Sequence, residues 1–284
     1  MTTFRFNFSG EDDDINKLES KESIRWLDSE EVVADKQIRN VDDEVTRAKM
    51  FACGDVEIGH VVISEAMASI EECGLKNAIE LAEKEHSDLI AGKYEGGLKI
   101  WECTYDLIQY LEENNTEIKL DNSNVLDLGC GAGILGIYAF LNQSKVTFQD
   151  YNKEVLEYFT ISNVILNIEE DENRQTEIQK CKFYSGDWAS FNKKLPSSVV
   201  YDIILTSETI YNECNYEKLI SLFTDRLSKD GVAYVAAKTY YFGVGGGTRQ
   251  FEEAIQKHGK LTSIVCWKST GGIQREILKI THKP

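Results

Sequence analysis

The sequence predicts an α/β fold with a doubly wound, mostly parallel β-sheet. From about residue 98 onward, apolar runs of strand length alternate with segments of helical spacing, which is the pattern of strand–helix–strand units. A glycine-rich turn follows the first apolar run, as expected where a buried strand leads into a helix. Residues 202–206 are nearly all apolar, which is typical of a strand covered on both faces.

The elements are expected in a regular order. A leading helix is predicted over residues 100–111, because apolar side chains recur there at helical spacing: Ile100, Cys103, Leu107 and Leu111. Strands are predicted at 125–128, 146–149, 181–184, 202–206, 232–237, 261–267 and 273–280, and helices at 133–141, 152–164, 215–227 and 248–257. The pattern therefore predicts a seven-stranded, Rossmann-like sheet.

Turn and loop signals complete the second half of the chain. Gly231 is expected to stop the helix over 215–227. Residues 169–180 are rich in polar side chains and are expected to form a surface loop. Residues 270–273, Thr-Gly-Gly-Ile, predict a hairpin between the last two strands, which makes one strand of the sheet antiparallel.

The N-terminal part of the chain has a different character. Residues 10–57 are polar and acidic with weak periodicity, and we expect them to be largely disordered or loosely attached. A short helix is expected over 61–72. The segment Phe4-Arg-Phe-Asn-Phe8 alternates like a short strand or docking peptide, and a frayed tail fits it equally well.

Composition limits the classes of partner. The chain has 48 acidic and 31 basic residues and a formal charge of −17. Residues 1–90 hold 22 acidic and 10 basic residues, so most of this charge lies in the first third. Such a field disfavours direct nucleic-acid binding and favours a basic protein partner, although an acidic surface also serves solubility. No apolar run approaches 18 residues, so no membrane contact is expected.

The seven cysteines predict no metal site. They are scattered without a C-x-x-C pair or zinc spacing, which suits buried thiols in a reducing compartment. Cys130 lies in the glycine turn, but no histidine or other base is near it in the sequence. We therefore interpret Cys130 as a packing residue and not as a nucleophile.

The glycine turn after residues 125–128 predicts a nucleotide-like ligand. Read from Gly129 it is G-x-G-x-G, the pattern of methyltransferases that use S-adenosylmethionine. Read from Gly131 it is G-x-G-x-x-G, the dinucleotide fingerprint, which here begins two residues past the strand end. Asp150 follows Gly129 by 21 residues and can accept both ribose hydroxyls of either ligand. A turn without a ligand is the remaining alternative.

Further polar residues follow the next strands, where ligands of such sheets bind. Asp187 and Trp188 come after the third strand and can serve an adenine ring, although Trp188 also fits ordinary packing. Glu208 and Tyr211 come after the fourth strand, at the edge closest to a transferred methyl group. Their spacing places them about one turn apart if the segment is helical.

Two more segments flank the predicted site. Glu102 begins the leading helix, where it could bind the ammonium group of a methionine moiety or simply favour the helix dipole. The aromatic and glycine-rich loop over residues 240–248 could form a lip for a planar substrate group or serve only as a connector.

Several segments together resemble the eukaryotic protein-histidine methyltransferases, whose target class is a histidine of large-subunit ribosomal protein three. They are Glu95-Gly-Gly-Leu-Lys-Ile-Trp-Glu-Cys-Thr104, Asp127-Leu-Gly-Cys-Gly131, Gln149-Asp-Tyr-Asn152, Thr206-Ser-Glu-Thr-Ile-Tyr211 and Tyr241-Phe-Gly-Val-Gly-Gly-Gly247. The resemblance covers about residues 86–281, and Phe4–Phe8 also resembles the start of that family. The stretch over 10–85 is shorter than in that family.

The resemblance implies a class I methyltransferase domain over 86–284, and the composition predicts an acidic, partly disordered extension over 1–85 before it. It implies S-adenosylmethionine as cofactor, S-adenosylhomocysteine as product, and a basic ribosomal protein as partner. We expect a monomer in the cytoplasm and nucleus. The expected cofactor-binding residues are Ile100, Trp101, Glu102, Cys103, Thr104, Gly129, Gly131, Asp150, Tyr151, Asn152, Gly186, Asp187, Trp188 and Ser207.

A histidine acceptor does not require a strong general base. The pKa of a histidine ring is about 6.5, so its neutral form dominates at pH 7. Glu208 is the expected catalytic carboxylate that favours the developing ring charge, and Tyr211 is expected to orient the ring. The substrate entrance is expected at Phe242, Gly243, Gly245 and Gly246. The alternatives are a lysine acceptor, a non-catalytic acidic escort for a basic ribosomal protein, and a dehydrogenase.

Overall fold

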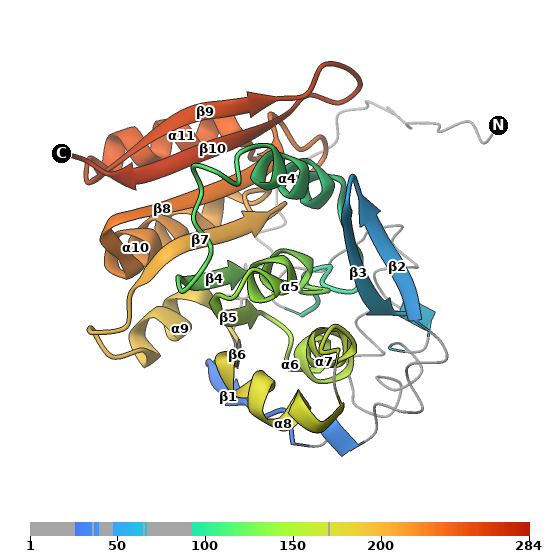
Figure 1. Cartoon of the computed structure of the whole chain (residues 1–284). Helices are drawn as coiled ribbons and strands as arrows, with labels where there is room; N and C mark the ends of the chain where they lie inside the picture. The colour runs from blue at the N-terminus through green and yellow to red at the C-terminus, as the bar shows by residue number, and fades with distance from the viewer. Residues whose placement is uncertain (1–25, 36, 40–47, 65, 67–92, 170) are drawn as a thin grey trace, which may run out of the picture.

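The computed structural model describes residues 26–35, 37–39, 48–64, 66, 93–169 and 171–284. In this part of the chain an eight-stranded sheet has the order β1-β6-β5-β4-β7-β8-β10-β9, and a two-stranded hairpin, β2–β3, lies beside it (Figure 1). Residues Phe4–Phe8 and 67–72, for which a strand and a helix end were expected, lie outside the described residues.

The centre of the sheet is parallel. Its strands are β4 (Asn124–Leu128), β5 (Lys145–Asp150), β6 (Cys181–Ser185), β7 (Tyr201–Ser207) and β8 (Leu227–Lys238). Each pairs in parallel with its neighbours in the series β6-β5-β4-β7-β8. At one edge β10 (Arg275–His282) runs antiparallel between β8 and β9 (Leu261–Lys268). The predicted doubly wound, mostly parallel sheet is confirmed.

Helices cover both faces because the strand residues alternate between two cores. Val125 of β4 packs into one cluster, while its neighbour Leu126 packs into the other. The first cluster includes residues of α4 (Glu102–Glu113), α5 (Ile134–Leu141) and α7 (Ile161–Leu166). The second includes residues of α9 (Trp188–Lys194), α10 (Tyr216–Arg226) and α11 (Thr248–His258).

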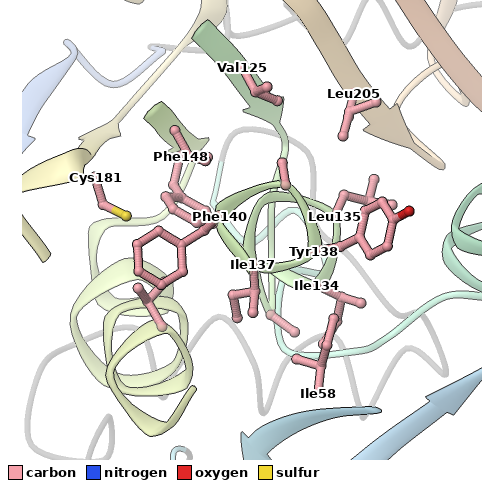
Figure 2. Close-up of a cluster of buried hydrophobic side chains, with 14 of the residues drawn as sticks. Ile58, Val125, Ile134, Leu135, Ile137, Tyr138, Phe140, Phe148, Cys181 and Leu205 are labelled. Atoms are coloured by element: carbon pink, nitrogen blue, oxygen red, sulfur yellow. The ribbon is translucent and has the colours of Figure 1, made fainter. Parts of the chain in front are cut away.

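Helix α5 sits at the centre of the first core. Figure 2 shows its side chains surrounded by Val125 and Phe148 of the sheet on one side and Ile58 of the hairpin on the other. All of residues 134–140 are buried, because the helix lies between the sheet and β3. A methyl group on Gly136 would lie 2.2 Å from a Phe148 ring carbon, so only glycine lets the helix pack this closely.

The described parts of the N-terminal segment are more ordered than the sequence predicts. Strand β1 (Glu30–Val32) pairs antiparallel with β6 and adds an eighth strand to the sheet. The hairpin of β2 (Ala48–Cys53) and β3 (Val56–Val61) buries Phe51 and Ile58 in the first core. The prediction that residues 10–57 are largely disordered is therefore wrong for their described parts, because isolated apolar residues there find partners on the domain.

Four local predictions need correction. Helix α10 ends at Arg226 and Gly231 lies inside β8, because Leu227 is already extended. The helix expected over 152–164 is α6 (Lys153–Val155), a π-helical segment η3 (Leu156–Thr160) and α7.

The loop expected over 169–180 contains η4 (Asp171–Asn173), α8 (Arg174–Glu177) and η5 (Ile178–Lys180). Val61 belongs to β3, so the helix expected from residue 61 begins only at Ile63. The short helices η1 (Gln37–Arg39) and η6 (Glu213–Asn215) complete the described elements.

Candidate active site

A cavity lies at the carboxyl ends of β4, β5, β6 and β7. Aromatic rings, glycine backbone and a few carboxylates line it, a mixture typical of small-molecule sites. Strand-end residues line it, among them Gly129 after β4, Asp150 at the end of β5, Gly186 after β6 and Ser207 at the end of β7. This is the edge at which open α/β sheets bind their ligands.

The glycine turn forms the floor of the cavity. Gly129, Gly131 and Gly133 all have positive φ, at 66°, 50° and 77°. The Gly131 N–H donates to Asp150 Oδ2 at 2.9 Å. A Cβ on Gly131 would lie 2.8 Å from the carbonyl oxygen of Gly97, so two glycine segments touch here. The turn is therefore fixed both to the next strand and to the segment before α4.

Two buried carboxyls face this floor. Burial raises the pKa of Asp150 to about 6, against hydrogen bonds from the backbone of Gly131 and Asn152 that lower it. Burial also raises the pKa of Asp127 well above its ordinary value, although the Gly136 N–H donates to it at 2.8 Å. Since burial disfavours both charges, a ligand that brings hydroxyl donors or a positive group stabilises them.

Cys130 does not behave as a nucleophile. Burial, followed by the charges of Asp127 and Asp150, raises the pKa of its thiol well above the ordinary value. The thiol therefore stays protonated, whereas a reactive cysteine needs a lowered pKa. This agrees with its interpretation as a packing residue.

The loop after β6 is held by a buried network. The indole N–H of Trp188 donates to Gln149 Oε1 at 2.9 Å, and Gln149 Nε2 donates to the carbonyl of Gly186 at 2.7 Å. Asp187 caps α9 by accepting from the Ala189 N–H at 3.0 Å. Gly186, Asp187 and Trp188 all line the cavity, so the loop presents an ordered wall.

The start of α4 closes another side. Ile100, Trp101 and Thr104 line the cavity, and the Thr104 hydroxyl lies 2.8 Å from the Ser207 hydroxyl at the end of β7. The Trp101 indole N–H donates to the carbonyl of Gly96 at 3.3 Å. These bonds fasten the leading helix over the strand ends.

Three residues expected to contact the cofactor lie elsewhere. The Glu102 side chain is 65% exposed and lies 4.0 Å from Arg275, because it points out of the first turn of α4. Cys103 is buried beside Glu208 and does not line the cavity. The Asn152 side chain accepts from the Glu95 N–H and donates to the Lys93 carbonyl, so it ties down the preceding segment. Glu95, and not Glu102, is the carboxylate of this segment that lines the cavity.

Glu208 enters the cavity from a strained backbone. Its φ is 57°, a left-handed conformation that costs about 1–2 kcal/mol for a residue with a side chain. It is 7% exposed, and its Oε1 lies 3.6 Å from the ammonium nitrogen of Lys238. Neither carboxylate oxygen has a partner at full hydrogen-bond geometry among the described residues, although Cys103 and Tyr241 lie beside it. Burial, followed by the charge of Glu208, raises the pKa of both the Cys103 thiol and the Tyr241 phenol. A buried carboxylate with open lone pairs at a cavity points to a ligand that satisfies it.

Tyr211 lines the same cavity but is not one helical turn from Glu208, because residues 208–212 are not helical. Its hydroxyl donates a short hydrogen bond to Glu95 Oε2. Burial, followed by the charge of Glu95, raises the pKa of the Tyr211 phenol well above its ordinary value. The phenol therefore remains a hydrogen-bond donor.

The glycine-rich loop lies outside the cavity. None of the four residues expected at the substrate entrance lines it: Phe242, Gly243, Gly245 and Gly246. Phe242 is 82% exposed, and Tyr240 packs edge-on against it with ring centroids 5.0 Å apart. Gly246 approaches the backbone of Ile210 and Tyr211 so closely that a Cβ would lie 2.6 Å from the Ile210 carbonyl oxygen. The loop thus borders the segment that carries Tyr211.

The structure adds lining residues that the sequence did not assign. They are Trp26, Glu95, Gly96, Gly97, Lys99, Asp127, Cys130, Ala132, Ile134, Leu135, Thr209 and Asn215. Most of them lie within the motif segments named from the sequence or close to them, so their position in the chain could have identified them. Trp26 had none, because it lies in a polar stretch far from every motif.

The lining fits the S-adenosylmethionine predicted from the sequence. Asp150 can accept hydrogen bonds from a ribose diol. The carboxyls of Glu208 and Asp127 also line the cavity, where a sulfonium or ammonium group would balance their negative charge. Thr209 packs closely against Gly129, since a Cβ there would lie 2.7 Å from the Thr209 methyl group. Within the described ranges, no group of three or more His, Cys, Asp or Glu is placed to hold a metal. None of the helices described there has the length and apolar character of a membrane span.

Comparisons with known proteins agree with this geometry. The family described as lysine methyltransferase matches residues 83–253. A histidine protein methyltransferase 1 homolog of Dictyostelium discoideum is 44% identical over 70% of this chain and 62% of its own length. The homolog of Bos taurus is 42% identical over 73% of this chain and 61% of its length. The protein N-lysine methyltransferase METTL21A of Xenopus tropicalis is 29% identical over 60% of this chain and 72% of its length. The chain thus spans about three-fifths of the histidine methyltransferase relatives that it matches.

Proposed function

Because this chain belongs to the family described as lysine methyltransferase, we propose that it is an S-adenosylmethionine-dependent protein methyltransferase whose acceptor is a histidine ring nitrogen. Relatives named histidine protein methyltransferase 1 homolog are 40–44% identical to it, whereas the METTL21A relative is 29% identical. The higher identity to the former supports the histidine acceptor.

The observation that carries the proposal is the state of Glu208. Its two buried oxygens lack partners at full hydrogen-bond geometry among the described residues, and they lie where the end of β7 meets the cavity. Lys238 at 3.6 Å offsets part of the cost of burying this charge. A pre-formed anion at this edge favours a reaction that builds positive charge on the acceptor.

When bound, S-adenosylmethionine would supply an activated methyl group on its sulfonium. Transfer of this methyl group to one ring nitrogen of neutral histidine would leave S-adenosylhomocysteine. The ring becomes cationic, and the proton on its other nitrogen then leaves. Glu208, which is 7% exposed, stabilises the cationic ring and can accept this proton.

Tyr211 and Glu95 act as a unit in this scheme. The phenol is bonded to Glu95, so its position beside the acceptor is fixed by the segment that precedes α4. In our proposal the pair limits how the acceptor ring enters. Tyr211 thus orients the ring through its position and Glu95 fixes that position.

A lysine acceptor is the second candidate, favoured by the family description and by the METTL21A relative. A lysine ammonium must lose a proton before it attacks, and its ordinary pKa is about 10.4. Turnover with a lysine acceptor would therefore keep rising above pH 8, whereas turnover with histidine would level off above about pH 7.

We further propose a basic large-subunit ribosomal protein as the substrate and a location in cytoplasm and nucleus, on the resemblance to the histidine methyltransferases. The net charge of −17 supports a basic partner. The exposed loop over residues 240–247 is proposed as the surface that this protein meets.

The test is transfer of an isotopically labelled methyl group to basic large-subunit ribosomal proteins, with the modified residue identified by tandem mass spectrometry. The proposal expects label on one histidine, and none after that histidine is replaced by alanine. Label on lysine instead would transfer the assignment to the second candidate.

A further inference from the structure

We propose that the N-terminal segment Trp26–Val32 is part of the cofactor site, with Trp26 as a binding residue for the adenine ring and Lys218 as the residue that positions it. The inference rests on the proposed function, since it names a further contact to the same cofactor. The matched family region begins at residue 83, so this contact comes from outside it.

Backbone bonds hold the segment against the cavity wall. The Leu27 N–H donates to the Tyr151 hydroxyl at 3.2 Å, and the Leu27 carbonyl accepts from the Asp187 N–H at 2.9 Å. Both Tyr151 and Asp187 line the cavity. Further along, Glu30 pairs with Ser185 in the β1–β6 ladder. The segment is therefore an integral edge of the sheet beside the loop after β6.

The Trp26 ring is fixed at the cavity by a shared cation. The Lys218 ammonium nitrogen lies 3.4 Å from the centroid of the Trp26 ring and 2.5 Å from Asp187 Oδ2. The Trp26 ring also meets Tyr151 edge to face, with centroids 6.0 Å apart. Trp26 itself lines the cavity. These contacts hold an indole over the same end of the cavity as Asp187.

This end suits an adenine ring. Asp150 at the end of β5 is placed for ribose hydroxyls, and the base of an adenosyl ligand then extends toward the end of the next strand, β6. Trp26, Tyr151 and Trp188 are three aromatic rings that line this part of the cavity. Aromatic rings recognise a base by its π-face. Trp26 therefore adds a stacking or edge contact that the residues after β6 do not supply.

The experiment is calorimetric titration of the full chain with S-adenosylhomocysteine. Trp26→Ala is expected to raise the dissociation constant about tenfold, equivalent to about 1.4 kcal/mol. Trp26→Phe keeps an aromatic face and should stay within about threefold of wild type. Val33→Ala serves as the matched control, because Val33 follows the same segment and is 67% exposed; it should bind like wild type.

Two further readouts separate binding from folding. Adenosine alone should lose affinity in Trp26→Ala by the same factor, because the lost contact is at the base. Lys218→Met frees the indole without removing it and is expected to weaken binding about threefold to fivefold, with the ligand-free melting temperature monitored in parallel.

The outcomes distinguish the two proposals. Wild type that binds neither S-adenosylhomocysteine nor adenosine would overturn the proposed function. Wild type that binds while Trp26→Ala and Lys218→Met bind equally well would overturn only the role of Trp26. Should Trp26→Ala fail to fold, Trp26→Leu and Lys218→Met decide the matter by the same comparison.

Discussion

The ammonium nitrogen of Lys238 lies 3.6 Å from Oε1 of Glu208, so the last residue of β8 is paired with the residue that follows β7. Glu208 has a left-handed backbone conformation, and the hydroxyl of the preceding Ser207 is hydrogen-bonded to the hydroxyl of Thr104 in α4. The pair therefore fixes a buried carboxylate where β7, β8 and the leading helix meet.

Replacing Glu208 with glutamine is expected to slow methyl transfer about 10²–10³-fold, because the neutral amide cannot stabilise the positive charge on the acceptor. Affinity for S-adenosylhomocysteine should stay within about threefold of wild type. Single-turnover rates and calorimetry measure the two quantities. Glu213→Gln, at an exposed position in η6, is the matched control. Unchanged turnover in Glu208→Gln would remove Glu208 from the chemistry.

Cofactor affinity should depend on pH through Asp150. Its pKa of about 6 means that the carboxylate, which accepts from the ribose hydroxyls, forms fully only above that value. Affinity for S-adenosylhomocysteine should therefore rise between about pH 5 and pH 7. The nearby carboxyls of Glu95 and Asp127 interact electrostatically with Asp150. In Asp150→Asn the affinity should fall about tenfold and the rise near pH 6 should disappear; a rise that persists there would assign it to another group.

The raised pKa of Asp150 also makes the free energy of unfolding depend on pH. Its pKa is raised from an ordinary 3.8 to about 6 by burial, so the folded chain keeps this proton at pH values where the unfolded chain loses it. The contribution is fully present below about pH 4 and is lost as the pH rises through about 6. Compared with Asp150→Asn, the ligand-free wild type should lose free energy of unfolding across this window. Urea unfolding at pH 4.5 and pH 7 measures the difference between the two proteins.

Gly131→Ala should destabilise the ligand-free protein by about 2–3 kcal/mol. The methyl would lie 2.8 Å from the Gly97 carbonyl oxygen, in addition to the cost of a φ of 50°. Gly243→Ala is the matched control, because its φ is 83° but nothing lies within 4 Å of a Cβ there. It should cost about 1 kcal/mol. Equal losses in denaturant titrations would show that the close approach of the two glycine segments is unimportant.

Phe242→Ala should raise KM for the protein substrate about tenfold and leave KM for S-adenosylmethionine unchanged. The ring is 82% exposed and lies on the loop that borders Tyr211, outside the cofactor cavity. Ile264→Ala on β9 removes another exposed apolar side chain and should have no effect. A change in the KM for the cofactor would contradict the proposed separation of the two surfaces.

The parallel core could be predicted because its residues obey simple periods. Ile203, Ile204 and Leu205 are buried on alternate faces of β7, so a continuous apolar run correctly predicted a strand covered on both sides. The glycine turn and Asp150 were also predictable, since a strand, a turn and a second strand end must meet at one edge. The structure places these residues together as the sequence suggests.

The rest depended on contacts between distant parts of the chain. Strand β1 has only three residues and is stabilised by pairing with β6, which no local pattern reveals. The choice between Glu95 and Glu102 depended on where α4 begins: Glu102 is its first residue and points toward Arg275. The π-helical segment near Thr160 likewise reflects a tertiary contact, since its hydroxyl donates to the Gly131 carbonyl at 2.6 Å.

The cavity at the ends of β4 to β7 is assigned to an adenosyl methyl donor. The decisive measurement is calorimetric titration of the folded full chain with S-adenosylmethionine. We expect saturable binding at one site, weakened in Asp150→Asn and abolished in Gly129→Arg. Absence of binding by the folded wild type, or binding of NAD with higher affinity, would contradict it.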